Sequence, residues 1–336
     1  MKRVIELLHG SGGIQSRVLI EELFYKYFDN TYLRQNSDAV YLEMGQGRIA
    51  FTTDSYVVTP LFFPGGDIGK LAVYGTVNDL AVRGSQPLYL SCSMIIEEGL
   101  ELTVLEKVVE SMHLASKEAG VQIVTGDTKV VPNGKGDSLY INTAGIGIMR
   151  HKRSISPSEI RAEDDVIITG SIGEHEIALL LAREEVPLKT RITSDCAPLG
   201  RMLNTLCEEF EGQIHMMRDP TRGGLATVLN EIISSSELGI EIEKSKIPIQ
   251  ACVQGVCELL GIDPFYSANE GKAVIVCDAR ISHQLLKRLH TFELGRGAAI
   301  IGKVVKVHKK KVWVKTKLGT YYVLAPLSTL QVPRIC

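Results

Sequence analysis

Apolar residues alternate with polar residues and glycines over most of the first 150 positions, a pattern typical of β-strands joined by turns. Short apolar runs predict strands at 48–53, 88–96, 121–125 and 139–149. A helix is predicted among them, because apolar residues recur at helical spacing from Leu102 to Ala119 and Gly120 follows as a C-terminal stop. We expect this helix to pack one face against a sheet.

The pattern changes at residues 151–165, a charged segment that contains Pro157 and precedes an apolar run at 166–170. Helices are then predicted between strands at 174–183, 197–210, 224–236 and 282–289. Short strands are expected between 302 and 323, with a turn at 318–320. This alternation is typical of an α/β or α+β fold, so we predict one domain over 1–150 and a second over 151–324.

The last twelve residues, 325–336, differ from everything before them. Pro326 and Pro333 oppose regular structure, and the chain ends in Cys336. At about 3.3 Å per extended residue, such a tail spans on the order of 40 Å. We expect a mobile tail that is long enough to carry Cys336 into a neighbouring cleft.

Composition excludes several classes of protein. Lys and Arg number 37 against 39 Asp and Glu, a net charge of −2, so tight nonspecific binding of nucleic acid is not expected. No window holds the roughly 20 apolar residues that a membrane helix needs, and no export signal is found. The seven cysteines contain no C-x-x-C pair, which favours a reducing cytoplasm. Six of them are expected to be small core residues.

A glycine-rich segment, HGSGG at 9–13, precedes apolar-periodic residues that include Val18, Leu19 and Leu23. A flexible loop that exposes N–H groups at a helix start is suited to phosphate, although a plain turn has the same composition. The segment is neither a P-loop nor a dinucleotide-binding motif.

Five aspartates stand where apolar runs end: Asp38, Asp54, Asp79, Asp127 and Asp219. Carboxylate oxygens are the ligands that Mg²⁺ prefers, and a nucleoside triphosphate requires such ions. Any one of these aspartates is explained equally well as a helix cap or an Asx turn. Their number favours a metal and phosphate site.

Two of these aspartates have basic neighbours. Asp219 and Arg222 lie just before a predicted helix and offer a metal ligand and a phosphate clamp. Lys129 follows Asp127 and is able to neutralise phosphate, or is an ordinary surface lysine.

Glu270 and Cys336 are candidates for the chemistry itself. Glu270 precedes an apolar strand at 273–277 and is either a general base or a plain acid before a strand. A thiol at a mobile terminus is a nucleophile and group carrier, unless the terminal cysteine is accidental.

Seven segments together resemble the HypE family of hydrogenase maturation factors, the carbamoyl dehydratases. They are HGSGG at 9–13, FTTDSYVVTPLFFPGGDIGKLAVYGTVNDLAVRG at 51–84, VTGDTKVV at 124–131, INTAGIG at 141–147, RDPTRGG at 218–224, SANEGK at 267–272 and PRIC at 333–336. The family is part of an ATP-binding superfamily with AIR synthetase, selenophosphate synthetase and thiamine monophosphate kinase. The resemblance covers essentially the whole chain.

The resemblance implies a two-domain AIR synthetase-like fold, α/β (α+β), whose N-terminal sheet forms a homodimer. ATP and Mg²⁺ are the implied cofactors. The implied partners are the carbamoyltransferase HypF, which loads a carbamoyl group onto the terminal thiol, and the HypC–HypD scaffold, which receives cyanide for the iron of [NiFe]-hydrogenase. ATP drives dehydration of the S-carboxamide to a thiocyanate.

Carried onto this sequence, the resemblance implies three groups of residues. The nucleotide is assigned to Gly10, Ser11, Gly12, Gly13, Asp54, Asn78, Asp127, Thr128, Arg222 and Gly223. The metal is assigned to Asp38, Asp79 and Asp219. Cys336 is the carrier, Glu270 the candidate base for the amide protons, and Lys129 the group that stabilises the departing charge.

Two alternatives remain open. One is a small-molecule kinase or synthetase of the same superfamily, such as a selenophosphate synthetase. The reactive cysteine expected near the glycine-rich loop of that enzyme is missing, since no cysteine precedes Cys92. The other is a noncatalytic carrier in which Cys336 only shuttles a group between partners. The carboxylates and glycines argue against this second alternative.

Overall fold

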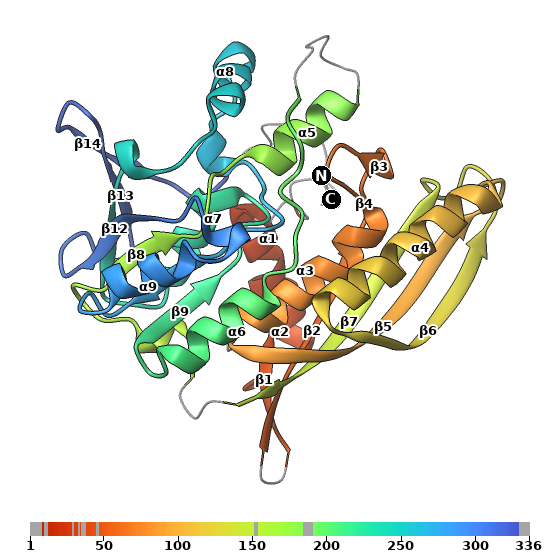
Figure 1. The fold of residues 1–336 in the computed structure, drawn as a ribbon, viewed down its shortest axis with the longest axis horizontal. Coiled ribbons are helices and arrows are strands. Elements are labelled where there is room, and N and C mark those ends of the chain that lie inside the picture. Colours follow the sequence, from red (N-terminus) through yellow and green to blue (C-terminus); the bar gives the residue numbers. More distant parts are fainter. Residues whose placement is uncertain are drawn as a thin grey trace.

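Two β-sheets, each packed against helices, organise the chain in the computed structural model (Figure 1). The structure describes residues 9, 13–28, 30–32, 34, 38–44, 47–150, 154–183 and 191–328. Within these ranges, no helix is long and apolar enough to cross a membrane.

The first sheet has the strand order β1-β2-β7-β5-β6, and its neighbours are antiparallel except for the parallel pair β5 and β6. Its strands are β1 (Val40–Met44), β2 (Gly47–Tyr56), β5 (Ser85–Glu97), β6 (Gln122–Val131) and β7 (Leu139–Met149). The helices α3 (Ile68–Val82) and α4 (Leu102–Ala119) lie across one face of this sheet (Figure 1). A short hairpin of β3 (Phe62–Phe63) and β4 (Gly66–Asp67) leads into α3.

Helix α3 is the central element of the first domain, and the sequence pattern did not predict it. Thirteen of its residues are buried, so apolar side chains occur all round the helix and show no amphipathic period. Asp67 caps its start by accepting hydrogen bonds from the Gly69 and Lys70 N–H groups. Helix α4 is amphipathic instead, and its predicted bounds are confirmed.

No helix of the described residues covers the other face of the first sheet. This face presents a band of apolar side chains that are 38–45% exposed: Phe51, Tyr89, Ile95, Ile146 and Ile148. Side chains paired directly across neighbouring strands point to the same face, which places these five on one surface. An apolar surface of this kind is typical of a protein interface.

The second sheet has the order β14-β13-β10-β12-β8-β11-β9, and only β10 and β13 are parallel among its paired strands. Its strands are β8 (Asp165–Ile168), β9 (Ile214–Arg218), β10 (Gly239–Glu243), β11 (Val274–Cys277), β12 (Ala299–Val305), β13 (Val312–Lys315) and β14 (Tyr321–Leu324). The core residues of alternate positions fall into two clusters, one against α7 (Gly224–Ile233) and one against α6 (Gly200–Glu209) and α9 (Ser282–Leu289). Helices therefore pack on both faces of this sheet.

The remaining helical elements are peripheral. α5 (Glu174–Ala182) and α8 (Ala251–Leu260) share a small core of their own. The N-terminal segment forms α1 (Ile14–Leu19), the π-helical η2 (Ile20–Phe24) and α2 (Tyr25–Phe28). Short 3₁₀ turns are η4 (Pro157–Glu159), η5 (Lys244–Lys246), η6 (Pro264–Tyr266) and η7 (Glu293–Gly295).

The two domains are joined by a buried contact around Arg83, at the end of α3. The guanidinium of Arg83 lies 3.9 Å from the ring centroid of Tyr41 and donates to the carbonyl of Ile155. The Tyr41 hydroxyl donates to the Arg83 carbonyl at 2.7 Å. Because a buried cation needs its charge and donors satisfied, this contact fixes the first sheet relative to the connection between domains.

Three expectations about local structure need correction. Asp79 lies inside α3 and Asp54 inside β2, because both elements continue past the predicted turns. The segment 126–129 belongs to β6, which runs to Val131 through hydrogen bonds to β5 that the sequence does not reveal. Cys252 is exposed on α8, so it is not a core residue.

Candidate nucleotide and metal site

A cavity of about 810 Å³ lies between the N-terminal helical segment, the first sheet and the second domain. Strand β2 contributes Thr52 and Asp54 to its lining, and α3 contributes Asp79. The loop after β9 adds Asp219 and Arg222, while Glu270 lines it from the segment before β11. Residues far apart in the sequence therefore meet around one polar chamber.

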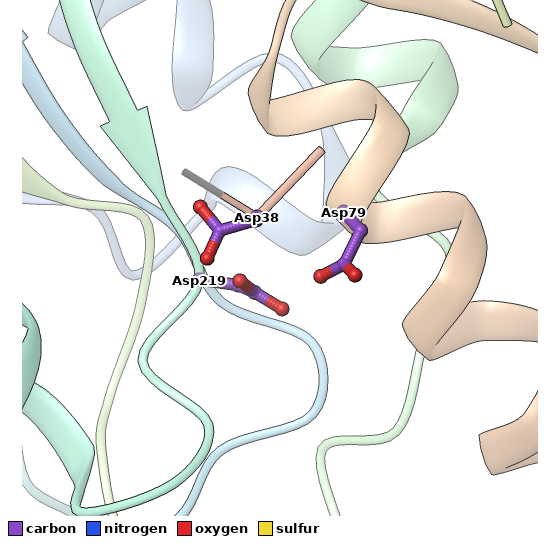
Figure 2. A group of neighbouring side chains, drawn as sticks. All are labelled: Asp38, Asp79 and Asp219. Atoms are coloured by element: carbon purple, nitrogen blue, oxygen red, sulfur yellow. The ribbon is translucent and has the colours of Figure 1, made fainter. Parts of the chain in front are cut away.

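Three of the predicted aspartates come together in this cavity. Ligand oxygens of Asp38, Asp79 and Asp219 lie within 4.8 Å of one another, with Asp79 projecting from α3 and Asp219 following β9 (Figure 2). The Thr52 hydroxyl lies 2.8 Å from both Asp79 Oδ2 and the main-chain carbonyl of Asp38. Arg218 Nε lies 3.0 Å from Asp38 Oδ1 and forms an ion pair with it.

The three carboxylates of the cluster repel one another electrostatically. Burial, followed by the charges of Asp219 and Asp38, holds the pKa of Asp79 well above its usual range. Burial and the charge of Asp38 raise the pKa of Asp219 to about 8, while Arg218 acts in the opposite direction. Like charges this close are not ionised together at low cost.

A divalent cation fits this donor set. Asp38 Oδ2 is buried and has no hydrogen-bond partner in the described part of the chain, which leaves it free to be a ligand. The side chains offer only carboxylate oxygens, the chemistry that Mg²⁺ selects over the softer sites of zinc or copper. Such a cation would also offset the repulsion between the three carboxylates.

Asp54 and Arg222 face each other across the cavity entrance. Arg222 Nη2 lies 2.7 Å from Asp54 Oδ1, and the Arg222 side chain is 50% exposed. This exposed pair joins the two domains through β2 and the loop before α7. A half-exposed guanidinium in the cavity wall is suited to phosphate, because it can exchange one anionic partner for another.

Glu270 is a buried acid in the cavity wall, less exposed than the aspartates of the cluster. It is 5% exposed, and burial together with the charges of Asp219, Asp195 and Asp54 holds its pKa well above the usual range. A carboxyl group with a raised pKa is a stronger base once deprotonated, a property useful for proton abstraction.

Asn78 and Gly223 have structural contacts here and are not among the residues lining the cavity. The Asn78 amide donates to the carbonyls of Ala197 and Glu270 at 3.0 and 3.2 Å, and its Oδ1 accepts from the Leu199 N–H at 2.7 Å. Gly223 has φ +69° at the start of α7, a backbone conformation that favours glycine. Asn78 supports the cavity wall through its bond to Glu270, and Gly223 is the neighbour of Arg222 in the chain.

Of the glycine-rich segment at 9–13, the structure describes His9 and Gly13, and both line the cavity. Gly13 lines the cavity and precedes α1, as expected for a helix start, whereas Gly10, Ser11 and Gly12 lie outside the described residues. The tail meets it there: the Ile14 N–H donates to the Leu327 carbonyl at 3.2 Å. A Cβ on Gly13 would lie 2.2 Å from that carbonyl oxygen.

The tail is attached to the second domain before it reaches Gly13. The Tyr266 hydroxyl donates to the Ala325 carbonyl at 2.8 Å, and Asn230 donates to the Leu324 carbonyl at 2.9 Å. Up to residue 328 the tail thus follows a defined path to the cavity. Cys336 itself lies outside the described residues.

Asp127, Thr128 and Lys129 are not brought into the cavity of their own chain. Asp127 and Lys129 lie opposite Ser93 and Ile95 of β5, on the apolar face of the sheet that none of the described helices covers. Their side chains are 61% and 68% exposed and contact each other at 2.6 Å. Asp54 points to the opposite face, toward α3, so the sheet itself separates these groups.

Sequence reasoning missed several residues that support the site. Thr52, Asp195 and Arg218 bond directly to a site residue or to its backbone, and Lys272 is paired with Asp195. Thr52, Arg218 and Lys272 lie inside the quoted motif segments, and that position was the available signal. Asp195 lies in a segment with no regular structure and gave no signal.

The chain matches two family models in succession. Residues 36–149 match "AIR synthase related protein, N-terminal domain", and residues 161–315 match "AIR synthase related protein, C-terminal domain". Among curated proteins, the chain is similar to carbamoyl dehydratase HypE of Cupriavidus necator, with 46% identity over 99% of this chain and 95% of the relative. It is also similar to carbamoyl dehydratase HypE of Escherichia coli, with 43% identity over 99% of both chains.

Solved structures agree in fold over nearly the whole chain. A HypE–HypF complex superposes with a TM-score of 0.87 at 46% identity, covering 92% of this chain and 99% of that one. HypE in complex with ATP superposes with a TM-score of 0.83 at 44% identity, covering 99% and 100%. The two-domain AIR synthase-like fold predicted from the sequence is confirmed.

Proposed function

Because the chain belongs to the HypE family of carbamoyl dehydratases in hydrogenase maturation, we propose that it uses ATP to dehydrate an S-carbamoyl group on its own Cys336 to a thiocyanate. The observation that carries the proposal is one cavity that holds three clustered carboxylates, a half-exposed arginine and a buried glutamate, with the tail of the chain attached at its edge. A relative of known structure binds ATP.

In the proposed dehydration, the amide oxygen is first phosphorylated and then leaves as phosphate. An amide oxygen is a poor leaving group, so the terminal phosphoryl group of ATP is transferred to it and ADP leaves. The C–O bond then breaks, phosphate departs with that oxygen, and the two N–H protons are removed as the C≡N bond forms. The products are the thiocyanate, ADP and phosphate. No oxidant or reductant is needed.

The residues divide this work between them. Asp38, Asp79 and Asp219 would hold Mg²⁺, which screens the charge of the triphosphate when bound. Arg222 binds a phosphate in place of Asp54, to which it is now paired. Glu270 accepts an amide proton, which its raised pKa favours.

We propose that the tail delivers Cys336 to the cavity from the anchor at Leu327. Nine residues, 328–336, follow that anchor, and at about 3.3 Å per residue they reach up to roughly 30 Å. This length is sufficient to cross a chamber of about 810 Å³, which is on the order of 10 Å wide. The contact at Leu327 therefore limits the volume that the Cys336 thiol can reach, and that volume still includes the cavity.

We further propose that the site is completed by a second copy of the chain. Lys129 and Asp127 lie on the uncovered apolar face of the first sheet and are separated from their own cavity. Pairing two such faces would bury the apolar band. Thr53 and Ser55 of β2 share that face with Phe51 and also line the cavity, so Lys129 of one copy would approach the cavity of the other there, where a cation stabilises the departing charge.

A relative has been solved in a HypE–HypF complex, so we propose a HypF-type carbamoyltransferase as the source of the carbamoyl group. A HypC–HypD scaffold is the proposed acceptor of the cyanide. The six described cysteines are all free, which fits the reducing cytoplasm we propose as the place of action.

Mass spectrometry of the C-terminal peptide tests the proposal directly. The chain is loaded with the carbamoyltransferase, carbamoyl phosphate and ATP in a brief reaction, freed of nucleotide, and then incubated with or without Mg-ATP. We expect a carbamoyl adduct on Cys336 that loses one water only with ATP present, and no adduct in Cys336→Ala. An adduct that never dehydrates would identify a carrier, and ATP consumption without an adduct would identify a small-molecule synthetase or kinase.

A further inference from the structure

The segment 194–199 contacts both domains and the backbone of Glu270, and none of its residues is among those lining the cavity. It has no regular secondary structure, yet both domains hold it through hydrogen bonds. The Ser194 N–H donates to the Pro64 carbonyl of the first domain at 2.8 Å, and its hydroxyl lies 2.8 Å from His175 Nδ1 of the second. We call 194–199 the strap.

Asp195 is the residue through which the strap contacts the backbone of Glu270. Its Oδ1 accepts from the Glu270 N–H at 3.0 Å, and its Oδ2 accepts from the Gly271 N–H at 3.2 Å. Lys272 Nζ lies 3.1 Å from the same Oδ2, with the two side chains 12% and 3% exposed. One buried carboxylate thus satisfies two consecutive main-chain donors and one cation.

The backbone of the strap lies so close to the backbone at Gly271 that no side chain fits between them. A Cβ on Gly271 would lie 1.9 Å from the Asp195 carbonyl oxygen, so only glycine fits at that position. Asn78 of α3 holds both segments at once, since its amide bonds Ala197 and Leu199 of the strap and the Glu270 carbonyl. The Glu270 backbone is therefore fixed on its N–H and its carbonyl side.

We propose that Asp195 is a positioning residue, which fixes the Glu270 carboxyl group for proton abstraction by clamping the N–H groups of Glu270 and Gly271; this inference rests on the proposed function. Lys272 is the counter-ion that holds the Asp195 carboxyl group in place. The clamp matters because a misplacement of about 1 Å costs a catalysed reaction on the order of a hundredfold in rate. Asp195 does not line the cavity and touches no reacting atom.

Three variants separate clamping from simple stability. Asp195→Ala removes both acceptors, Asp195→Asn keeps one carbonyl oxygen, and Lys272→Met keeps the carboxylate but removes its counter-ion. Asp278→Asn is the matched control, because it breaks an Asp–Arg pair at the other end of the strand that follows Glu270. All are made in the full-length chain.

The first readout is the rate of water loss from the carbamoylated protein, measured with the affinity for Mg-ATP. We expect dehydration to fall by at least about tenfold in Asp195→Ala, less in Asp195→Asn and Lys272→Met, and not at all in Asp278→Asn. The affinity for Mg-ATP should stay within about twofold, because Arg222 and the three aspartates are untouched. A parallel loss of affinity and rate would reduce Asp195 to a structural role and overturn the inference.

The second readout is independent of activity. Hydrogen exchange at the Glu270 and Gly271 amides should accelerate by about tenfold in Asp195→Ala, with α7 unchanged. Unchanged protection of these two amides would overturn the inference even if the rate fell. If the wild-type chain failed to dehydrate its adduct, the proposed function would be wrong, while the exchange measurement would still decide whether Asp195 positions Glu270.

Discussion

At the scale of single residues, the cavity is governed by carboxylates whose charges oppose one another. Asp79, Asp219 and Glu270 all have pKa values raised by burial and by neighbouring acids. Arg218 and Arg222 offset part of this charge from the second domain. The site is therefore built to receive cations and to hold protons.

Removing one carboxylate of the cluster should weaken nucleotide binding. We expect Asp79→Asn or Asp219→Asn to lower the affinity for Mg-ATP by about tenfold or more, because the cation loses a charged ligand. Isothermal titration calorimetry with and without Mg²⁺ measures the effect. Asp278→Asn, outside the cavity, should bind like the wild type, and unchanged affinity in both cluster variants would remove them from the metal site.

The same repulsion predicts how stability depends on pH. The folded pKa of Asp219, about 8, lies above its unfolded value, so between these values the folded state binds more protons than the unfolded one. The free energy of unfolding should therefore fall as pH rises from about 4 to 8 in the absence of divalent cations.

Chemical denaturation at several pH values checks this dependence. Added Mg²⁺ should restore stability at the upper end of the range, since it stabilises the ionised carboxylates. Asp219→Asn should show a shallower decline. A variant that declines as steeply as the wild type would contradict the assignment of the slope to Asp219.

At the scale of elements, α3 connects the core of the first domain to the site. It supplies Asp79 to the cluster and Asn78 to the strap from adjacent positions, and it packs against the first sheet and against α6. A helix that is buried all round holds its polar groups in fixed places, because its side chains have no room to rearrange.

A truncation in α3 should be costly where the same change in α4 is not. Leu71 is fully buried in α3, so Leu71→Ala should lower the free energy of unfolding by about 2–5 kcal/mol. Leu102 of α4 is 78% exposed, and Leu102→Ala should change it by less than about 0.5 kcal/mol. Urea denaturation compares the two, and equal costs would contradict the central role of α3.

At the scale of the whole molecule, the two faces of the first sheet carry different groups of side chains. One face, with α3 above it, forms the cavity wall through Thr52 and Asp54. The opposite face carries the apolar band together with Lys129 and Asp127. A second copy placed on the apolar band is the arrangement that would use both faces.

Complementation tests whether Lys129 acts across such a dimer. Lys129→Ala and Asp219→Asn should each be inactive in dehydration, whereas refolded mixtures of the two should recover about a quarter of wild-type activity. Half of the dimers would be mixed, and each would contain one intact site. No recovery in a mixture that light scattering shows to be dimeric would mean that Lys129 does not act in the partner's site.

Much of this arrangement follows from the sequence. The amphipathic periods of α4 and α9 predicted their bounds, because an exposed and a buried face leave a regular pattern. The motif segments contain Asp79 and Asp219, and Asp38 was predicted with them as an aspartate beside an apolar run; the fold brings all three together. Helix α3 escaped prediction because burial on all sides removes the periodicity that reveals a helix.

The two-domain fold and the residue types of the site could be predicted from the amino-acid sequence. Both follow from periodicity and local motifs, which depend on near neighbours along the chain. Tertiary structure alone decided that Lys129 lies behind the sheet, that Leu327 meets Gly13, and that Asp195 clamps Glu270. These contacts join segments with no local signal in common. Their geometry follows from how sheets and helices pack, and packing depends on the whole chain.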